Sequence, residues 1–217
     1  RKDDFRPEVH DSDGLMVATG EGEWLWRPLQ NPRQVLVTSF ATTNPKGFGL
    51  MQRDRQWSSY EDVEARYERR PSAWVRPLHP WGPGRVELVQ LPTPDETHDN
   101  VVAYWVPQQL PAPGTPLEVS YELAWQGDEQ QRPPSAWATQ SRKGVGYTQQ
   151  SAEALRTQVQ YVVDFTGPAL HDLKADAPVK AVVTSDANGR VLESGVYRNP
   201  ATGQWRMTLR VERLRKD

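Results

Sequence analysis

The sequence predicts an all-β fold, and three observations support this class. Segments that alternate polar with apolar residues, or that are rich in β-branched and aromatic residues, outnumber helical ones. Proline, glycine, asparagine and aspartate bound most of these segments, as turn residues bound strands. A single stretch has the residue spacing of a helix. We therefore expect antiparallel strands joined by turns.

Seven segments are predicted strands. In chain order they are residues 33–40, 84–91, 100–106, 116–125, 158–165, 179–186 and 204–214. RQVLVTSF, GRVELVQL and PLEVSYELAW alternate polar with apolar residues, which is typical of strands with one buried face. NVVAYWV, QVQYVVDF and VKAVVTSD are rich in β-branched or aromatic residues, and QWRMTLRVERL alternates again.

The candidate helix is YEDVEARYER, residues 60–69. Val63 and Tyr67 lie four residues apart, and Pro71 prevents much extension of a helix. An irregular turn explains these residues equally well, so both interpretations stay open.

A domain boundary is expected after residue 130. The stretch that follows, with RPPSAWATQSRKGVGYTQQ, has almost no apolar periodicity, and we interpret residues 131–154 as a linker. Residues 1–130 then form one β domain and residues 155–217 a second, in which Asn188-Gly189 predicts a hairpin turn. An immunoglobulin-like sandwich usually needs roughly 100 residues, so the second domain is expected to be truncated.

Composition excludes several functions. Charge is balanced, with 26 basic and 28 acidic residues, so neither nucleic acid nor a membrane surface is an expected partner. No apolar run is long enough to span a bilayer, and the first residues of this segment are not those of a signal peptide. Cysteine is absent, and the four histidines lack metal-ligand spacing, so we expect no metal and no cofactor.

The segment PEVHDSDGL, residues 7–15, raises a choice between a turn and an active-site acid. Asp and Ser bond their own backbone in turns, so HDSDG could simply close a loop. A calcium loop is a weak interpretation, because the glutamate required at the twelfth position is missing.

Six segments of the chain carry long and specific motifs. They are HDSDG (10–14), GEWLWRPLQNP (22–32), NPKGFGLMQRDR (44–55), YEDVEARYERRPSAWV (60–75), WGPGRVELVQLPT (81–93) and ETHDNVVAYWVP (96–107). Together they resemble the periplasmic glucan biosynthesis proteins of the G/D type, which make or trim the osmoregulated β-1,2-glucans of Gram-negative bacteria. The resemblance covers residues 4–125 and, more weakly, the C-terminal strands.

The resemblance also implies a particular architecture. Family members are longer, with a signal peptide and the first half of a large antiparallel β-sandwich, of the galactose-mutarotase-like supersandwich type, before Arg1. Residues 1–130 are then the C-terminal half of the catalytic sandwich, and residues 155–217 an incomplete immunoglobulin-like sandwich. We expect an internal fragment of this kind to be inactive alone.

The resemblance implies an inverting glycoside hydrolase that acts on β-1,2-glucan. Its catalytic aspartates fall on Asp11 and Asp99, Glu96 matches a glutamate that assists proton movement, and Tyr67 matches a tyrosine near the substrate. The implied partner is the glucan itself in the periplasm, with contact to the glucan synthesis machinery at the inner membrane and a homodimer as further possibilities.

Inversion needs one protonated carboxyl group and one carboxylate, usually about 6.5 to 9.5 Å apart. Asp99 precedes the apolar run VVAYWV, so partial burial would raise its pKa and suit a general acid. Asp11 has polar neighbours that suit a general base. The opposite assignment and a relay of waters or sugar hydroxyls stay open.

Sugar binding calls for aromatic rings and planar guanidinium groups. The candidates are Trp24, Trp26, Arg27, Arg70, Trp74 and Trp81. Alternation places Trp24 and Trp26 on one strand face, where they form either a binding platform or a layer of the core.

Three other functions stay open on the sequence. The protein could transfer a glucan chain to a sugar hydroxyl rather than to water. It could bind and hold glucan without cleaving it, or serve as a structural β module only. The sequence does not separate the G type from the D type.

Overall fold

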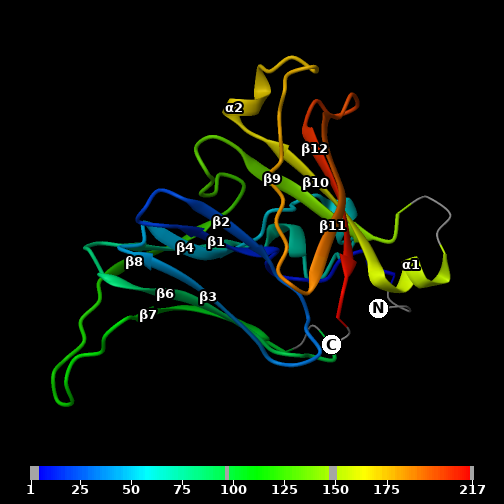
Figure 1. Cartoon of the computed structure of the whole chain (residues 1–217). Helices are drawn as coiled ribbons and strands as arrows, with labels where there is room; N and C mark the ends of the chain where they lie inside the picture. The colour runs from blue at the N-terminus through cyan, green and yellow to red at the C-terminus, as the bar shows by residue number, and fades with distance from the viewer. Residues whose placement is uncertain (1–4, 96–97, 147–150, 216–217) are drawn as a thin grey trace. The chain divides into compact units, whose positions relative to one another are not determined.

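The computed structural model describes residues 5–95, 98–146 and 151–215, and the all-β class is confirmed in it (Figure 1). These residues contain antiparallel strands β1 to β12 and two short α-helices. The chain divides into two compact units, Arg1–Gln131 and Arg132–Asp217. Each unit is described by itself below.

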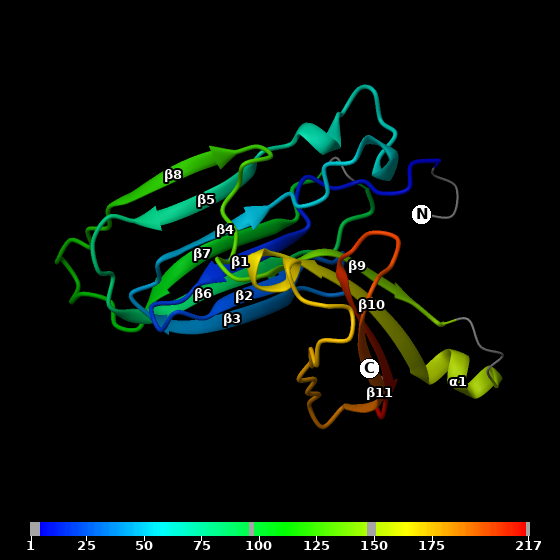
Figure 2. The same cartoon turned by 90° about the horizontal axis from the view of Figure 1, so that it is seen from above.

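Unit 1 contains two antiparallel sheets. The five-stranded sheet has the order β2-β1-β4-β5-β8, and the three-stranded sheet has the order β3-β6-β7. The strands are β1 Gly14–Ala18, β2 Trp24–Pro28, β3 Leu36–Thr43, β4 Gly47–Met51, β5 Ser72–Pro77, β6 Pro83–Gln90, β7 Val101–Pro107 and β8 Tyr121–Gln126. The smaller sheet lies along one face of the larger (Figures 1 and 2).

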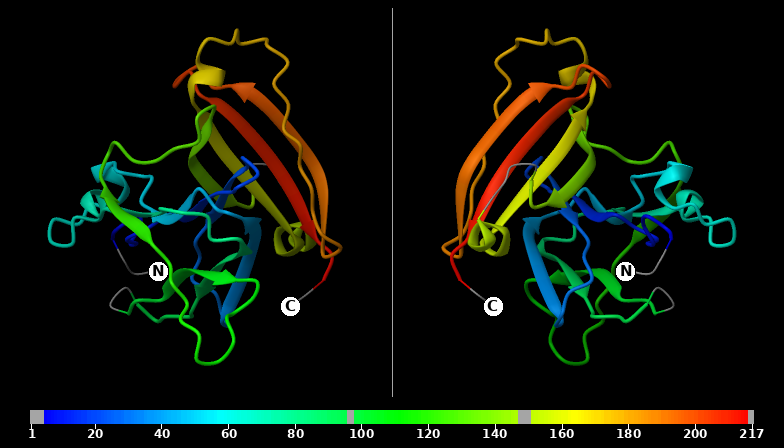
Figure 3. Two further views of the ribbon diagram at one scale, coloured as in Figure 1. Left: turned by 90° about the vertical axis from the view of Figure 1, so that its left-hand side faces the viewer. Right: turned by 90° about the vertical axis from the view of Figure 1, so that its right-hand side faces the viewer.

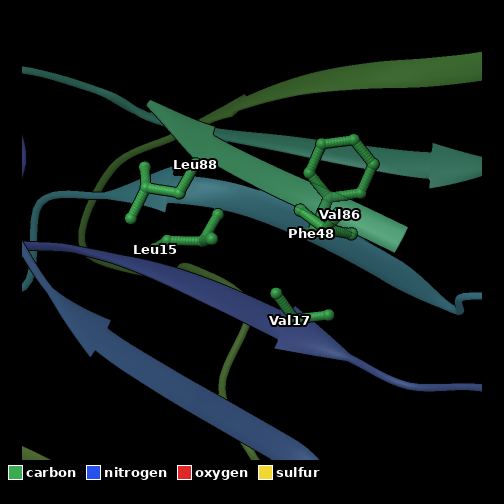
Figure 4. Packing of buried hydrophobic residues seen from close by; sticks show 5 residues of the cluster. All are labelled: Leu15, Val17, Phe48, Val86 and Leu88. Carbon is green, nitrogen blue, oxygen red and sulfur yellow. The ribbon is translucent and has the colours of Figure 1, made fainter. Parts of the chain in front are cut away.

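The core of unit 1 lies between these two sheets. Leu15 and Val17 of β1 point toward Val86 and Leu88 of β6, with Phe48 of β4 beside them (Figure 4). All five side chains are at most 4% exposed. Because side chains alternate along a strand, every second residue of β1 and β6 reaches this layer.

The opposite face of the five-stranded sheet is also covered. Met16 and Ala18 of β1 pack there against Met51 and Trp74, with Trp24 and Trp26 alongside. Strand β1 is therefore buried on both faces, which explains why its sequence GLMVA is continuously apolar rather than alternating.

Indole rings lie directly on glycines of neighbouring strands in unit 1. A Cβ atom at Gly14 would overlap the ring of Trp26, and one at Gly47 would overlap the ring of Trp74. Glycine is required at both positions because the rings occupy the space that any side chain would need.

Strand β8 is the outermost strand of its sheet and carries an exposed apolar stripe. Alternate residues in and before it leave 44–67% of their surface exposed. We call these residues the β8 stripe: Leu117, Val119, Tyr121, Leu123 and Trp125.

Unit 2 contains one antiparallel sheet with the order β11-β12-β10-β9 (Figure 3). The strands are β9 Trp137–Gly144, β10 Gln158–Thr166, β11 Gly189–Arg198 and β12 Trp205–Arg213. Helix α1, Ala152–Thr157, precedes β10, and helix α2, Pro168–His171, follows it. Asp164, 3% exposed on β10, bonds Arg142 of β9 and both Nε and Nη2 of Arg206 on β12.

Two interpretations of unit 2 from the sequence were wrong. Strand β9 lies inside the stretch 131–154 that we interpreted as a linker, because a polar segment can pair through its backbone at the edge of a sheet. Residues 179–186 form no strand, so the turn at Asn188 does not join two strands of a hairpin. Instead β11 begins at Gly189 and pairs with β12.

In unit 1 the predicted strand at 116–125 is shorter than expected, since β8 begins only at Tyr121. The segment 60–69 is not an α-helix but a series of turns that ends in a 3₁₀ helix, Tyr67–Arg69. Glu61 and Arg66 have φ values of 52° and 50°, in the left-handed region that interrupts a helix.

Candidate active site

Asp11 and Arg70 meet at one end of the five-stranded sheet. Asp11 lies in the loop before β1, Arg70 lies just before β5, and Nε of Arg70 is 3.3 Å from Oδ1 of Asp11. Both strands pair with β4 in antiparallel register, so both begin at the end where β4 finishes. The structure thus brings together a predicted catalytic residue and a predicted sugar-binding residue.

Tyr67 lies beside this pair. The Cζ atom of Arg70 is 5.6 Å from the centre of the Tyr67 ring, and Tyr67 is 6% exposed. A guanidinium group at this distance is attracted to the ring face. Asp11 and Arg70 themselves are exposed, at 61% and 45% of their side chains, so a ligand in solution can reach them.

The loop that carries Asp11 is tied to the end of β4 by Asp13. Oδ2 of Asp13 accepts hydrogen bonds from the backbone amides of Arg53 at 2.5 Å and Asp54 at 2.7 Å. The amide of Asp13 donates to the carbonyl oxygen of Met51 at 2.8 Å. The two aspartates of HDSDG therefore have different roles: Asp13 anchors the loop, and Asp11 presents an accessible carboxylate.

The loop that carries Asp99 is fixed at its base. Leu91 and Asn100 exchange two hydrogen bonds, from the Leu91 amide to the Asn100 carbonyl oxygen at 2.8 Å and from Asn100 Nδ2 to the Leu91 carbonyl oxygen at 3.0 Å. Asn31 bonds the backbone of Thr93 through both atoms of its amide. This loop follows the end of β6, as the Asp11 loop precedes the start of β1.

Hydrogen bonds connect the two loops through the segment after β2. The amide of Leu29 donates to the carbonyl oxygen of Asp13 at 2.9 Å, and the amide of Gln30 donates to Oε1 of the buried Gln90 at 2.8 Å. The loops of Asp11 and Asp99 therefore belong to the same end of the sandwich.

Asp99 differs from the expectation for a general acid. We expected partial burial beside the apolar run of β7, but Asp99 is exposed. The reason is its position one residue before Asn100, so that Asp99 belongs to the loop and not to the strand. Glu96 lies outside the described residues.

His10 forms an ionic cluster with two carboxylates beside Asp11. Its Nε2 atom is 2.9 Å from Oε2 of Glu8 and 3.7 Å from Oδ1 of Asp13. Burial alone would lower the pKa of His10, but the hydrogen bond to Glu8 and the negative charges of Asp13 and Glu8 outweigh burial and raise the pKa.

The same three side chains could also hold a metal ion, since their ligand atoms lie within 4.8 Å of one another. The histidine spacing in the sequence did not indicate this group. Its donors come from offsets of two and three residues in one loop, and only the folded loop brings them together. The contacts of His10 with Glu8 and Asp13 account for the arrangement without a metal.

The predicted sugar-binding tryptophans are mostly packing residues in the structure. Trp74 is 4% exposed, and its ring stacks on that of Trp24 with centroids 6.0 Å apart. Trp26 lies under the guanidinium group of Arg53, whose Cζ atom is 4.6 Å from the centre of the Trp26 ring. Arg27 is exposed and points to the opposite face of β2.

Trp81 is not brought to the end of the sandwich that carries the aspartates. It precedes β6, whereas the Asp99 loop follows β6, and an eight-residue strand spans about 25 Å. Its ring packs instead against Trp105 and Tyr121, with centroids 5.8 and 6.3 Å away.

The chain is similar to a known protein family and to several curated proteins. A family model described as "Periplasmic glucan biosynthesis protein, MdoG" matches residues 1–217. "Glucans biosynthesis protein G" of Ralstonia nicotianae is 55% identical over 216 residues, which are 99% of this chain and 43% of the relative. Proteins of the same name from Pseudomonas paraeruginosa and Pseudomonas aeruginosa are 50% identical over 213 residues.

The chain spans about two-fifths of the length of these curated relatives, 43% and 40% for the first two. Among the helices of the described residues, none is long and apolar enough to cross a bilayer.

Proposed function

Because the chain belongs to the family of periplasmic glucan biosynthesis proteins, as the resemblance predicted, we propose that the whole protein cleaves the β-1,2-glucan backbone as an inverting glycoside hydrolase. The observation that carries this proposal is the convergence of the Asp11 and Asp99 loops on one end of the sandwich, joined by hydrogen bonds of Leu29 and Gln30. Two carboxyl groups facing one substrate are the minimum that inversion requires.

In this mechanism Asp11 is the general base. Its exposed carboxylate draws a proton from a water molecule that attacks the anomeric carbon, and Arg70 places a positive charge beside that carboxylate. Asp99 is the general acid and hands its proton to the leaving oxygen on the opposite face of the sugar. Proton transfer can pass through a sugar hydroxyl or a water molecule where the direct distance is too long.

The glucan contacts that we propose rest on the same geometry and, for Glu96, on the family resemblance alone. Tyr67 and Arg70 contact the sugar next to Asp11, and Glu96 assists proton movement in the Asp99 loop. Trp24 and Trp26 extend the binding surface along one face of β2, and Trp74 supports it from beneath, because Trp74 is buried and stacks on Trp24. Arg27, on the opposite face of β2, lies outside that surface. Trp81 takes no part in this site.

The proposal extends to the surroundings of the protein. Action on a periplasmic glucan requires a periplasmic location and suggests contact with the machinery that synthesises the glucan at the inner membrane. A homodimer fits the proposal but does not follow from unit 1 or unit 2.

A non-catalytic glucan-binding protein is the second candidate. The exposure of Asp99 favours it, because a general acid usually lies in a partly buried environment that keeps its proton in place. On this alternative the aspartates contact glucan hydroxyls only.

One experiment separates the two candidates. Asp11→Asn and Asp99→Asn in the whole protein should each lower the release of short β-1,2-linked oligosaccharides by about 10²-fold or more. Glucan affinity should change little in both variants. Asp95→Asn is the matched control in the same loop, since the amide oxygen can keep the contact with His98.

Retention of cleavage by both variants would overturn the catalytic assignment. An absence of cleavage by the unmodified protein, together with tight glucan binding, would support the binding function. The anomeric configuration of the first product, followed by NMR, distinguishes inversion from retention.

A further inference from the structure

Gln52 is a fully buried polar side chain directly after β4. Its Nε2 atom carries two hydrogens and shares them among three acceptors: the carbonyl oxygens of His10 at 3.2 Å and Tyr67 at 3.0 Å, and the hydroxyl of Tyr60 at 2.9 Å. Buried donors normally satisfy one or two neighbours. Three acceptors around one amide nitrogen show that the surrounding loops are arranged about this group.

The acceptors of Gln52 belong to the two segments that form the site. His10 immediately precedes Asp11, and Tyr67 lies three residues before Arg70. The hydroxyl of Tyr60 donates its own proton to the carbonyl oxygen of Asp54 at 2.9 Å, so its oxygen accepts from Gln52. One amide therefore connects the segment of the proposed base to the segment of the proposed sugar contacts.

The position of Gln52 is itself fixed by the sheet. Its backbone amide donates to Oγ of the buried Ser72 on β5 at 2.9 Å, and its carbonyl oxygen accepts from Nε2 of Gln130 at 3.1 Å. These two hydrogen bonds fix the backbone of Gln52 at the end of β4, and so they limit where its side-chain amide can lie. Rigid supporting groups of this kind set the geometry of a catalytic residue.

Glutamate and methionine, which match glutamine in length, cannot replace the amide. The carboxylate of glutamate would turn an oxygen toward the three acceptors and would bury a charge. The thioether of methionine would leave the two backbone carbonyl oxygens without the donor that Gln52 supplies. Oε1 of Gln52 is buried and lacks an aligned partner, and the Gln52 side chain is among the groups that raise the pKa of His10. Both ends of the amide therefore face the His10 segment.

We propose that Gln52 is a positioning residue that holds the Asp11 loop in register with the Tyr67–Arg70 segment. It touches no substrate, and it acts by fixing the separation of Asp11 and Arg70. The inference rests on the proposed function for its effect on turnover, but its effect on the two loops is independent of that function.

The test uses Gln52→Met, which keeps the length of the side chain and removes its donors. The matched control is Thr42→Val, because Thr42 is also buried and loses its hydrogen bonds to Gly20 and Glu21 at the opposite end of the sheet. We expect Gln52→Met to lower kcat for β-1,2-glucan at least tenfold and to change KM less than threefold. Thr42→Val should leave both values near those of the unmodified protein.

Hydrogen exchange supplies a readout that does not depend on turnover. Amides of residues 8–13 and 66–70 should exchange at least tenfold faster in Gln52→Met and should be unaffected in Thr42→Val. Unchanged exchange in these segments, or a kcat that Thr42→Val lowers equally, overturns the inference. If the unmodified protein cleaves no glucan, the proposed function fails, and hydrogen exchange alone decides the role of Gln52.

Discussion

Nε of Arg70 lies 3.3 Å from Oδ1 of Asp11, although the two residues belong to loops that precede different strands. Strand β4 pairs with β1 on one side and with β5 on the other, and this pairing aligns the two loops. The contact is therefore a product of sheet order and does not depend on sequence proximity.

Replacing Arg70 should affect activity far more than stability. The pair is exposed, so Arg70→Ala should change the free energy of unfolding by less than about 1 kcal/mol. Loss of the charge beside the proposed base should lower kcat about tenfold, which corresponds to about 1.4 kcal/mol in the barrier. Thermal melting and steady-state kinetics on β-1,2-glucan check both values. Arg69→Ala is the control, since Arg69 is more exposed and faces Glu68, and an equal loss of activity there would contradict the assignment.

The cluster of His10 predicts a stability that depends on pH. Since the pKa of His10 is raised above its ordinary 6.5, the protonated ring stabilises the folded state fully below pH 6.5. That contribution should disappear as the pH rises through the higher pKa of the folded state. Urea unfolding of the unmodified protein and of His10→Gln between pH 6 and pH 9 should show the difference in stability shrinking with rising pH.

Glu8→Gln supplies the control for this prediction. The hydrogen bond to Glu8 is the largest of the effects that raise the pKa of His10, so its loss should lower that pKa. NMR titration of the His10 ring measures the change directly. An unchanged pKa would show that the ionic cluster does not form in solution.

Asp164 should be the most sensitive carboxylate in unit 2. It is buried and bonds two arginines, so Asp164→Ala would remove the carboxylate that both guanidinium groups contact and should cost about 3 kcal/mol. The arginines hold the pKa of Asp164 below its ordinary value, chiefly through the hydrogen bonds of Arg206. Its stabilisation is therefore present above pH 3.8 and should be lost as the pH falls through the lower folded pKa.

Denaturation with urea at pH 7 and pH 3 checks this prediction for Asp164. Asp172→Ala is the matched control, because that side chain is 94% exposed and contacts only His171 among the pairs described. Equal stabilities of the two variants at pH 7 would contradict the assignment of Asp164 as a structural anchor.

The contact of Gly47 with Trp74 predicts a large cost for a single methyl group. Gly47→Ala would push the Trp74 ring out of its buried position, at a cost of about 1 to 3 kcal/mol. Gly127→Ala should be neutral, because a Cβ there meets no atom within 4 Å. Thermal unfolding and tryptophan fluorescence distinguish the two variants, and equal melting temperatures would show that the ring can move freely.

The sequence predicted strands from residue type, and such a prediction succeeds only where a neighbouring strand pairs with the segment. The segment 158–165 has the bounds of β10 almost to the residue, because valines on both faces indicate a central strand. VKAVVTSD has similar residues, but no neighbouring strand pairs with it. Conversely, β9 is a strand because its backbone pairs with β10, although WATQSRKG is polar.

The candidate site was predicted in part for the same reason. Motifs indicated Asp11 and Arg70, and the folded chain brings them together. Gln52 could not be found, because a buried amide that donates to backbone carbonyl oxygens leaves no pattern in the sequence of its acceptors. Trp81 and Trp74 were chosen by residue type, which cannot distinguish a sugar platform from packing.

The β8 stripe makes residues 1–217 prone to self-association. An outermost strand with unpaired backbone groups and a row of large apolar side chains is a template for pairing with further chains. Preparations of residues 1–217 alone should therefore form soluble aggregates or inclusion bodies as concentration rises. Charged substitutions at Leu123 and Trp125 should increase the yield of soluble protein. They should not disturb β4, because β5 lies between β4 and β8. Light scattering measured against protein concentration would show the decrease in aggregation.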